Sequence, residues 1–227
     1  MLTFAITLLI AYVLGSFPSS LVVGKAMGVD VRQHGSGNAG ATNAWRVLGK
    51  GPGLLVFALD FLKGALAVLI AHYVDLPGGL PNWPYAEAWV DMAAGAAAIL
   101  GHVYTLTGRL FFGSWRGGKG VATGGGVLLG LMPPAMLAAL AVLIVTVALS
   151  RYVSLGSIFA AITIPLVQVL RAVFLHNPPP APLVGFSILI PVFILYTHRQ
   201  NVKRLLAGTE TRFTTPARPV EEEMGER

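Results

Sequence analysis

The length of the apolar runs constrains this chain more than any other feature. Runs of spanning length, almost free of charge, cover residues 2–23, 51–74, 89–107, 152–174 and 182–197. The hydrocarbon core of a bilayer is about 30 Å thick, and an apolar helix of roughly 20 residues crosses it. Only 11% of the 227 residues are charged, against about 25% in soluble domains. The sequence therefore predicts an all-α, polytopic membrane protein.

A further apolar run, residues 121–149, is long enough for two helices, and Pro133 and Pro134 lie near its middle. Proline lacks an N–H group and breaks helices, so we expect two spans here, the first short and rich in glycine. This gives seven transmembrane helices, with six as the alternative count. Residues 1–213 are expected to form a single transmembrane domain with cytoplasmic motif loops, and residues 214–227 a disordered cytoplasmic tail.

Basic residues indicate the orientation of the spans. They follow the first and seventh spans and lie between the third and fourth and between the fifth and sixth; of the 16 Lys and Arg, only Lys63 and Arg171 fall elsewhere. Because cytoplasmic loops carry an excess of Lys and Arg, we expect the N-terminus outside and the C-terminus in the cytoplasm. Six spans would break this alternation. Residues 1–14 lack a basic segment and a cleavage site, which indicates a retained span.

Composition excludes several kinds of site. Without cysteine there can be no disulfide, thiolate metal site or cysteine nucleophile. No two of the five histidines have metal-ligand spacing, so we expect no metal. The net charge of +6 in a membrane protein indicates anionic substrates and membrane lipids, and not nucleic acid. The sequence fixes no oligomeric state, and a monomer is compatible with it.

The loop after the first span is rich in small and amide residues; it reads Gly35-Ser36-Gly37-Asn38-Ala39-Gly40-Ala41-Thr42-Asn43-Ala44-Trp45-Arg46. Small residues let backbone N–H groups approach an anion. The hydroxyl and amide side chains add neutral donors, and the arginine fork binds phosphate or carboxylate. The alternative is a polar turn between spans, although a turn needs neither so many small residues nor the arginine.

The loop before residue 121 places three glycines around a lysine; it reads Trp115-Arg116-Gly117-Gly118-Lys119-Gly120-Val121-Ala122-Thr123. It opens into a predicted helix, whose N-terminus offers free N–H groups and partial positive charge to a phosphate. The segment approaches the G-x-x-x-x-G-K pattern of nucleotide-binding loops. However, Gly120 stands where Ser or Thr would bind Mg²⁺, and no strand precedes it. The alternative is a basic loop that merely follows the orientation rule.

A third polar element follows the last span. On a helix, His198 and Asn201 are three residues apart and share a face, and Glu210 follows them. The alternative is a basic helix that contacts anionic lipid headgroups. Ser154 begins the sixth span on the same side of the membrane, where it contacts a substrate or bonds within its own helix.

Two opposite charges, Asp60 and Lys63, lie inside the second span. Charges inside a bilayer are costly and usually paired, so we expect an ion pair that holds spans together. A transport role would need a second intramembrane pair, which the sequence lacks. His102, at the end of the third span, suits a helix cap and a ligand contact equally.

Together these elements resemble the bacterial acyl-phosphate-dependent glycerol-3-phosphate acyltransferase family. The matching elements are residues 35–46, Asp60-x-x-Lys63-Gly64, Gly101-His102, residues 117–123, and residues 198–210, where His-x-x-Asn is followed by Arg204-Leu205 and Gly208-x-Glu210. The resemblance covers most of the chain. The stretch between His102 and Gly117 is longer than the family pattern.

The resemblance implies a multi-pass protein of the bacterial inner membrane that starts phospholipid synthesis. It would transfer a fatty acyl group from acyl phosphate to the sn-1 hydroxyl of glycerol 3-phosphate, giving lysophosphatidic acid and phosphate without a cofactor. Acyl phosphate is a mixed anhydride with a good leaving group. Positioning two anions and stabilising the oxyanion would therefore supply most of the rate.

For this reaction we assign roles as hypotheses. The catalytic set is Ser36, Arg46, Lys119, His198 and Asn201, in which Lys119 and Arg46 bind phosphates and His198 or a substrate phosphate is the base. The set expected to bind substrate and phosphate is Gly37, Asn38, Thr42, Asn43, Gly117, Gly118, Gly120, Thr123 and Ser154. Asp60, Lys63 and Glu210 are expected to be structural.

Three other functions stay open. An acyltransferase that uses acyl-CoA or acyl-carrier protein commonly contains His-x-x-x-x-Asp, which this sequence lacks. A transporter or flippase for a phosphate-bearing solute or lipid predicts inverted repeats, which are not visible here. A purely structural membrane protein leaves the three polar elements without a purpose.

The orientation can be tested directly. A reporter enzyme fused after Arg227 should be active in the cytoplasm, because the basic loops place the C-terminus there. Activity of that reporter only outside the cell would contradict the predicted topology.

Overall fold

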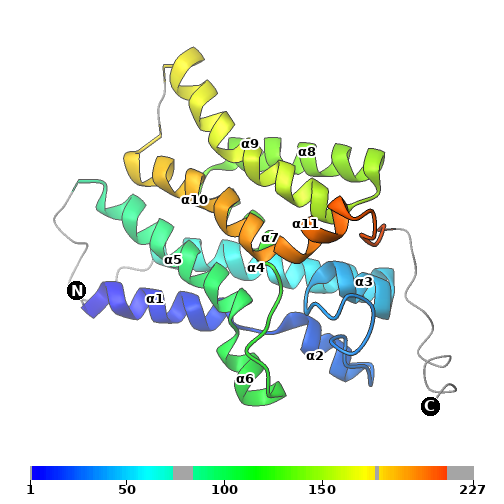
Figure 1. Ribbon diagram of the computed structural model, residues 1–227. Helices are drawn as coiled ribbons and strands as arrows, with labels where there is room; N and C mark the ends of the chain where they lie inside the picture. Colours follow the sequence, from blue (N-terminus) through cyan, green and yellow to red (C-terminus); the bar gives the residue numbers. More distant parts are fainter. Residues whose placement is uncertain (1, 74–83, 177–178, 214–227) are drawn as a thin grey trace, which may run out of the picture.

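The computed structural model describes residues 2–73, 84–176 and 179–213. These residues form helices and connections, with no strand among them (Figure 1), which confirms the all-α prediction. The helices are α1 (Leu2–Gly15), α2 (Ser19–Ala26), α3 (Ala41–Leu48), α4 (Lys50–Tyr73), α5 (Ala86–Val103), α6 (Leu106–Phe112), α7 (Val121–Leu131), α8 (Pro133–Ser150), α9 (Val153–Phe174), α10 (Ala181–Thr197) and α11 (Arg199–Leu206). The predicted tail, residues 214–227, lies outside the described residues.

The apolar runs predicted as spans are helical over most of their described residues. The first is broken at residues 16–18, between α1 and α2, and the third leaves its helix after Val103. Among the described residues, four stretches are long and apolar enough to cross a bilayer: Phe4–Ala26, Lys50–Tyr73, Pro133–Ser150 and Val153–Phe174. A fifth candidate joins α10 to α11 through a bend of 64°. The chain is therefore built as an integral membrane protein, while the count of seven spans stays a prediction.

The long run after Gly120 divides at the predicted prolines. Helix α7 ends at Leu131 and α8 begins at Pro133, where a proline in the first turn costs no hydrogen bond. With 11 residues, α7 is roughly 16 Å long, about half the thickness of a bilayer core. It is short, as predicted, and too short to cross alone.

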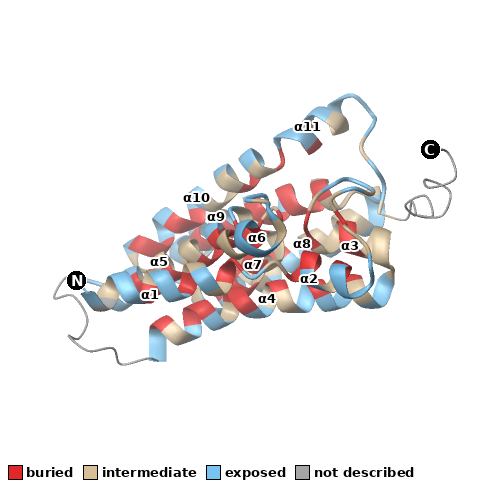
Figure 2. Ribbon diagram, turned by 90° about the horizontal axis from the view of Figure 1, so that it is seen from below, coloured by how far each residue is buried: buried red, intermediate tan, exposed pale blue. Residues whose placement is uncertain are grey.

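Burial divides the helices into a face toward the bundle and a face away from it (Figure 2). The larger core cluster includes Val127, Leu128 and Met132 around α7 and packs against side chains of α8, α9 and α10. Many large apolar side chains point outward, among them Leu137, Leu149, Val169 and Leu189. Soluble proteins rarely expose so much apolar surface, whereas lipid contacts it without cost.

A buried carboxylate joins three segments of the bundle. Asp60 on α4 is 2% exposed; it lies 2.8 Å from the Lys63 ammonium and accepts a hydrogen bond of 2.8 Å from the Ser19 hydroxyl. His102 on α5 approaches the same carboxylate at 3.5 Å. Lys63 also donates to the carbonyl of Phe17, in the break between α1 and α2. The cluster therefore ties α2, α4 and α5 together.

Helices α4 and α7 touch backbone to backbone through glycines. A Cβ added at Gly64 would lie 2.1 Å from the carbonyl oxygen of Thr123, and one added at Gly126 would lie 1.9 Å from the carbonyl oxygen of Phe61. Small residues allow such close approach between membrane helices. This contact fixes α7, and hence the loop that precedes it, against α4.

Gly126→Ala should lower the melting temperature, because overpacking costs about 1–3 kcal/mol and the backbone of Phe61 cannot rotate away. Gly185→Ala on α10 is the matched control, since its added Cβ would meet nothing within 4 Å. Thermal unfolding of both variants in the same detergent checks this, and equal melting temperatures would contradict the close packing.

Candidate active site

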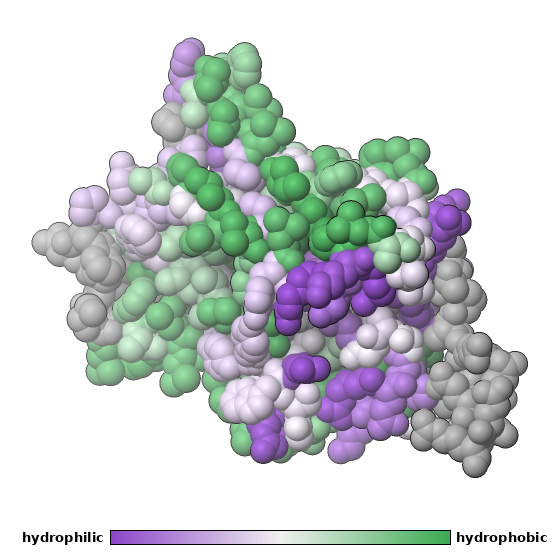
Figure 3. Space-filling model, viewed as in Figure 1, coloured by the Kyte–Doolittle hydropathy of each residue, from purple (hydrophilic) through white to green (hydrophobic). Residues whose placement is uncertain are grey.

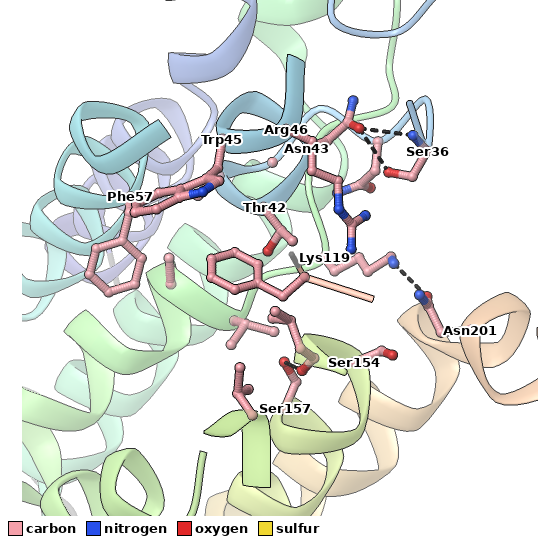
Figure 4. Close-up of a pocket in the computed structure, with 18 of the residues that line it drawn as sticks. Ser36, Thr42, Asn43, Trp45, Arg46, Phe57, Lys119, Ser154, Ser157 and Asn201 are labelled. Carbon is pink, nitrogen blue, oxygen red and sulfur yellow. Dashed lines mark hydrogen bonds between the residues drawn. The ribbon is translucent and has the colours of Figure 1, made fainter. Parts of the chain in front are cut away.

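A cavity of about 760 Å³ lies where α3, α11 and the ends of α4, α8 and α9 meet. Most of the strongly hydrophilic side chains gather toward the end of the molecule that carries α3 and α11 (Figure 3). In the close-up, Trp45 and Phe57 lie on one side, and Lys119, Asn201 and Ser36 on the other (Figure 4). The cavity thus has a polar half and an apolar half.

The first motif loop is held in shape by Asn43, which is 1% exposed. Its side-chain carbonyl accepts hydrogen bonds from the backbone N–H and the hydroxyl of Ser36, at 2.8 and 3.2 Å. Its amide donates to the carbonyls of Val31 and His34, at 2.7 and 3.1 Å. Gly35, at φ +61°, passes so close that an added Cβ would lie 2.5 Å from the Asn43 oxygen. Asn43 therefore shapes the loop that carries Ser36.

Arg46 reaches the cavity from α3. One terminal nitrogen, Nη2, donates to the carbonyls of Thr211 and Arg212, at 3.1 and 3.4 Å. Within the described part of the chain, its buried Nε has no hydrogen-bond partner. A guanidinium is always charged, so this arginine presents a fixed cation with a donor to spare for an anion.

Lys119 is held by a hydrogen-bond chain that ends on a carboxylate. The Lys119 ammonium donates to the Asn201 side-chain oxygen, and the Asn201 amide donates to Glu210 at 2.6 Å. Ser154 donates to the same carboxylate oxygen at 2.7 Å, and Arg204 to the other oxygen at 2.7 Å. Glu210 therefore connects α9, α11 and the loop before α7.

The surroundings of Lys119 bring its pKa close to neutral pH. Burial lowers the pKa of Lys119 to about 8, although Glu210 acts to raise it. Burial would raise the pKa of Glu210, but hydrogen bonds from Asn201, Ser154 and Arg204 outweigh it and lower that pKa. At neutral pH the cavity holds a lysine cation that a second, bound anion would stabilise further.

His198 lies in the bend between α10 and α11 and is 3% exposed. Its Nδ1 lies 2.9 Å from the carbonyl of Ile194. A carbonyl only accepts hydrogen bonds, so Nδ1 carries the proton and Nε2 is left as the acceptor. The residue lines the cavity, and burial, with the nearby Lys119 cation, lowers the pKa of His198 to about 4, so the ring is neutral at pH 7.

The glycine loop lies directly on the end of α5. A Cβ added at Gly118 would lie 2.2 Å from His102 Nε2, and one added at Gly117 would lie 1.8 Å from the His102 carbonyl oxygen. The Gly117 N–H donates to the carbonyl of Val103 at 3.0 Å. The two glycines therefore provide close packing against His102, and they bring Lys119 and Gly120 to the cavity.

Most of the predicted site residues meet at this cavity. It is lined by Ser36, Asn38, Thr42, Asn43, Arg46, Lys119, Gly120, Ser154, His198 and Asn201, together with Asp60 and Glu210. Gly37, Gly117, Gly118, Thr123 and Lys63 are not among the lining residues. Sequence reasoning gave no role to Trp45, Arg151 or Phe213, which also line it, because no local pattern sets these residues apart.

The apolar half of the cavity lies between two helices. Leu54 and Phe57 come from α4, and Leu143, Ile144 and Val147 from α8. Leu54 is 58% exposed and Ile144 56%, so this half opens sideways on the apolar surface. A ligand with an anionic head and a long apolar tail fits such a site.

The chain matches the family model described as glycerol-3-phosphate acyltransferase over residues 5–208. A glycerol-3-phosphate acyltransferase of Chlorobaculum tepidum is 40% identical over 234 residues, which cover 94% of this chain and 98% of the relative. One of Geotalea daltonii is 45% identical over 204 residues, covering 89% and 94%.

Two solved structures of an integral membrane glycerol 3-phosphate acyltransferase, PlsY (YgiH), are also similar. The glycerol 3-phosphate form has a TM-score of 0.79 and 40% identity, covering 93% of this chain and 96% of the solved chain. The lysophosphatidic acid form has a TM-score of 0.76 and 39% identity, covering 92% and 94%.

The titration of Lys119 can be followed by pulsed labelling with an amine-specific reagent and mass spectrometry of its peptide. The midpoint should lie at about pH 8, because burial favours the neutral amine. Glu210→Gln should move the midpoint to lower pH, because the carboxylate stabilises the ammonium. An unchanged or higher midpoint in this variant would contradict the assigned electrostatics.

Proposed function

The chain belongs to the glycerol-3-phosphate acyltransferase family, and on that premise we propose that acyl phosphate is its donor and the sn-1 hydroxyl of glycerol 3-phosphate its acceptor. The products are lysophosphatidic acid and inorganic phosphate, in the first step of phospholipid synthesis. The observation that carries the proposal is that one cavity joins the cations Arg46 and Lys119 to an apolar groove.

Both substrates carry a phosphate, and the polar half offers two cationic anchors. Arg46 approaches from α3 with a free Nε, and Lys119 from the loop before α7. Gly120 precedes α7, whose first backbone N–H groups are unpaired and add positive potential. Ser36 and Asn38, on the first motif loop, suit the acyl-phosphate head or the oxyanion that forms on its carbonyl.

The acyl transfer needs little more than positioning. The hydroxyl oxygen of glycerol 3-phosphate attacks the acyl carbon, the bond from that carbon to the phosphate oxygen breaks, and phosphate leaves. The hydroxyl proton passes to His198 Nε2 or to a substrate phosphate oxygen. Asn201 faces the same cavity and holds Lys119, so it keeps a phosphate and the attacking hydroxyl in register.

The absence of a common thioester-dependent motif supports acyl phosphate as the donor. A thioester would call for activation of the acceptor hydroxyl, commonly by His-x-x-x-x-Asp, and the sequence contains no such pair. The phosphate of an acyl phosphate is a better leaving group and at the same time a ligand for Arg46 and Lys119. Its fatty chain suits the groove between α4 and α8.

The proposal also implies where the protein lies and how it is oriented. The multi-pass chain would lie in the bacterial inner membrane, with the cavity and the C-terminus toward the cytoplasm, where phosphorylated substrates are made. The oligomeric state stays open, and a monomer is compatible with this scheme. The scheme uses neither metal nor cofactor.

The test is made on purified protein in detergent, without CoA, carrier protein or divalent metal. We expect long-chain acyl phosphate to release phosphate only with glycerol 3-phosphate present, with lysophosphatidic acid as the product by mass spectrometry. Lys119→Ala should lower kcat/KM by about 100-fold or more, as loss of a key electrostatic donor does.

Lys203→Ala is the control, because this exposed lysine of α11 does not line the cavity. Full turnover in Lys119→Ala would contradict its role. Binding of labelled glycerol 3-phosphate without any phosphate release would favour a transporter instead.

A further inference from the structure

The segment that follows α11, residues 209–213, crosses the end of the cavity; we call it the strap. It begins with a hydrogen bond of 2.8 Å from the Thr209 N–H to the Arg204 carbonyl. Glu210 then fixes it to α9 and α11. All five of its residues lie beyond the stretch matched by the family model, residues 5–208.

Phe213 connects the two sides of the cavity. Its backbone N–H donates to the carbonyl of Arg151, in the turn between α8 and α9, at 2.7 Å. Its ring lies 5.4 Å from that of Trp45, tilted by 39°. Trp45 in turn packs on the first turns of α4, where a Cβ added at Gly53 would lie 2.4 Å from the Trp45 Cα. Through Trp45, Phe213 therefore links the start of α4 to the end of α8.

These two helices are the walls of the apolar groove, so the strap closes the groove at one end. The segment after α11 lies beside the ends of α8 and α9 in Figure 1. Thr211 and Arg212 present their carbonyls to Arg46, which ties the strap to the phosphate-binding half. The strap thus closes the end of the groove that adjoins the phosphate-binding half. There the acyl carbon of an acyl phosphate would lie, between its phosphate and its fatty chain.

Closure at this point matters because water is a competing acceptor. A water oxygen that bonds to the acyl carbon breaks the bond to the phosphate oxygen and yields a fatty acid and phosphate. One water proton leaves with the phosphate, and the other ionises from the acid. Enzymes suppress such side reactions by excluding water from the reacting centre.

We propose that the strap, through the Phe213 ring seated on Trp45, shields the acyl carbon from water and so directs the reaction toward glycerol 3-phosphate. This role rests on acyl phosphate being the donor. An apolar ring offers water no hydrogen bond, and the two ends of the strap are fixed by Arg151 and Glu210. Phe213 is a positioning residue, because it acts on the surroundings of the reacting atoms.

The experiment compares Phe213→Leu with Phe213→Gln, two side chains of similar reach and opposite polarity, in the full-length protein. Fatty acid and lysophosphatidic acid formed from acyl phosphate are measured with and without glycerol 3-phosphate. We expect the ratio of fatty acid to lysophosphatidic acid to rise about tenfold or more in Phe213→Gln. Water that reaches the acyl carbon hydrolyses it faster, and a small decrease in the hydrolysis barrier is enough for a tenfold higher rate. It should stay near the wild-type value in Phe213→Leu.

Phe111→Ala is the control, since this 73% exposed side chain of α6 lies outside the cavity, and its ratio should be that of the wild type. A wild-type ratio in Phe213→Gln, with lysophosphatidic acid still formed, would overturn the proposal. A wild-type protein that releases no phosphate even with glycerol 3-phosphate would overturn the proposed donor, and the role of the strap with it.

Discussion

A carboxylate buried inside the membrane helices supports the rest of this structure. An isolated Asp60 would be costly at that depth, and it is stabilised by Ser19, Lys63 and His102 from three segments. His102 is in turn the surface on which Gly118 lies, where no larger residue fits. The position of Lys119 therefore depends on a charge cluster deeper in the bundle. Removing Asp60 would leave Lys63 without its carboxylate partner, so the site and the fold share one set of interactions.

Glu210 plays the corresponding part at the mouth of the cavity. It gathers Ser154, Asn201 and Arg204, and through Asn201 it reaches Lys119. The two carboxylates thus approach the same lysine loop from opposite ends, one through packing and one through hydrogen bonds. The cations are therefore held before substrate arrives, which is how preorganised electrostatics lower a barrier.

Sequence reasoning succeeded where a local rule decides the outcome. Apolar length placed the membrane helices, and the missing N–H of Pro133 placed the break between α7 and α8. It says less where distant segments decide. Gly117 and Gly118 have the composition of a phosphate cradle, and the structure adds a second reason for small residues there, because His102 lies against them. Phe213 carries no signal at all, since its place depends on a backbone carbonyl of Arg151, 62 positions away along the chain. Lipid-facing and cavity-facing leucines look alike in a sequence, so the groove on α8 could not be predicted.

The sideways opening of the apolar groove determines which concentration the protein responds to. Leu54 and Ile144 leave the space between α4 and α8 exposed on the surface that contacts lipid. A ligand that enters there has already partitioned into the bilayer, and it arrives by two-dimensional diffusion. The quantity that sets occupancy of the groove is then the mole fraction of that ligand among the membrane lipids, and not its molarity in water. Added lipid or detergent would therefore lower the occupancy of the groove by surface dilution. The occupancy of the polar half by a water-soluble ligand would still depend on the concentration of that ligand in solution.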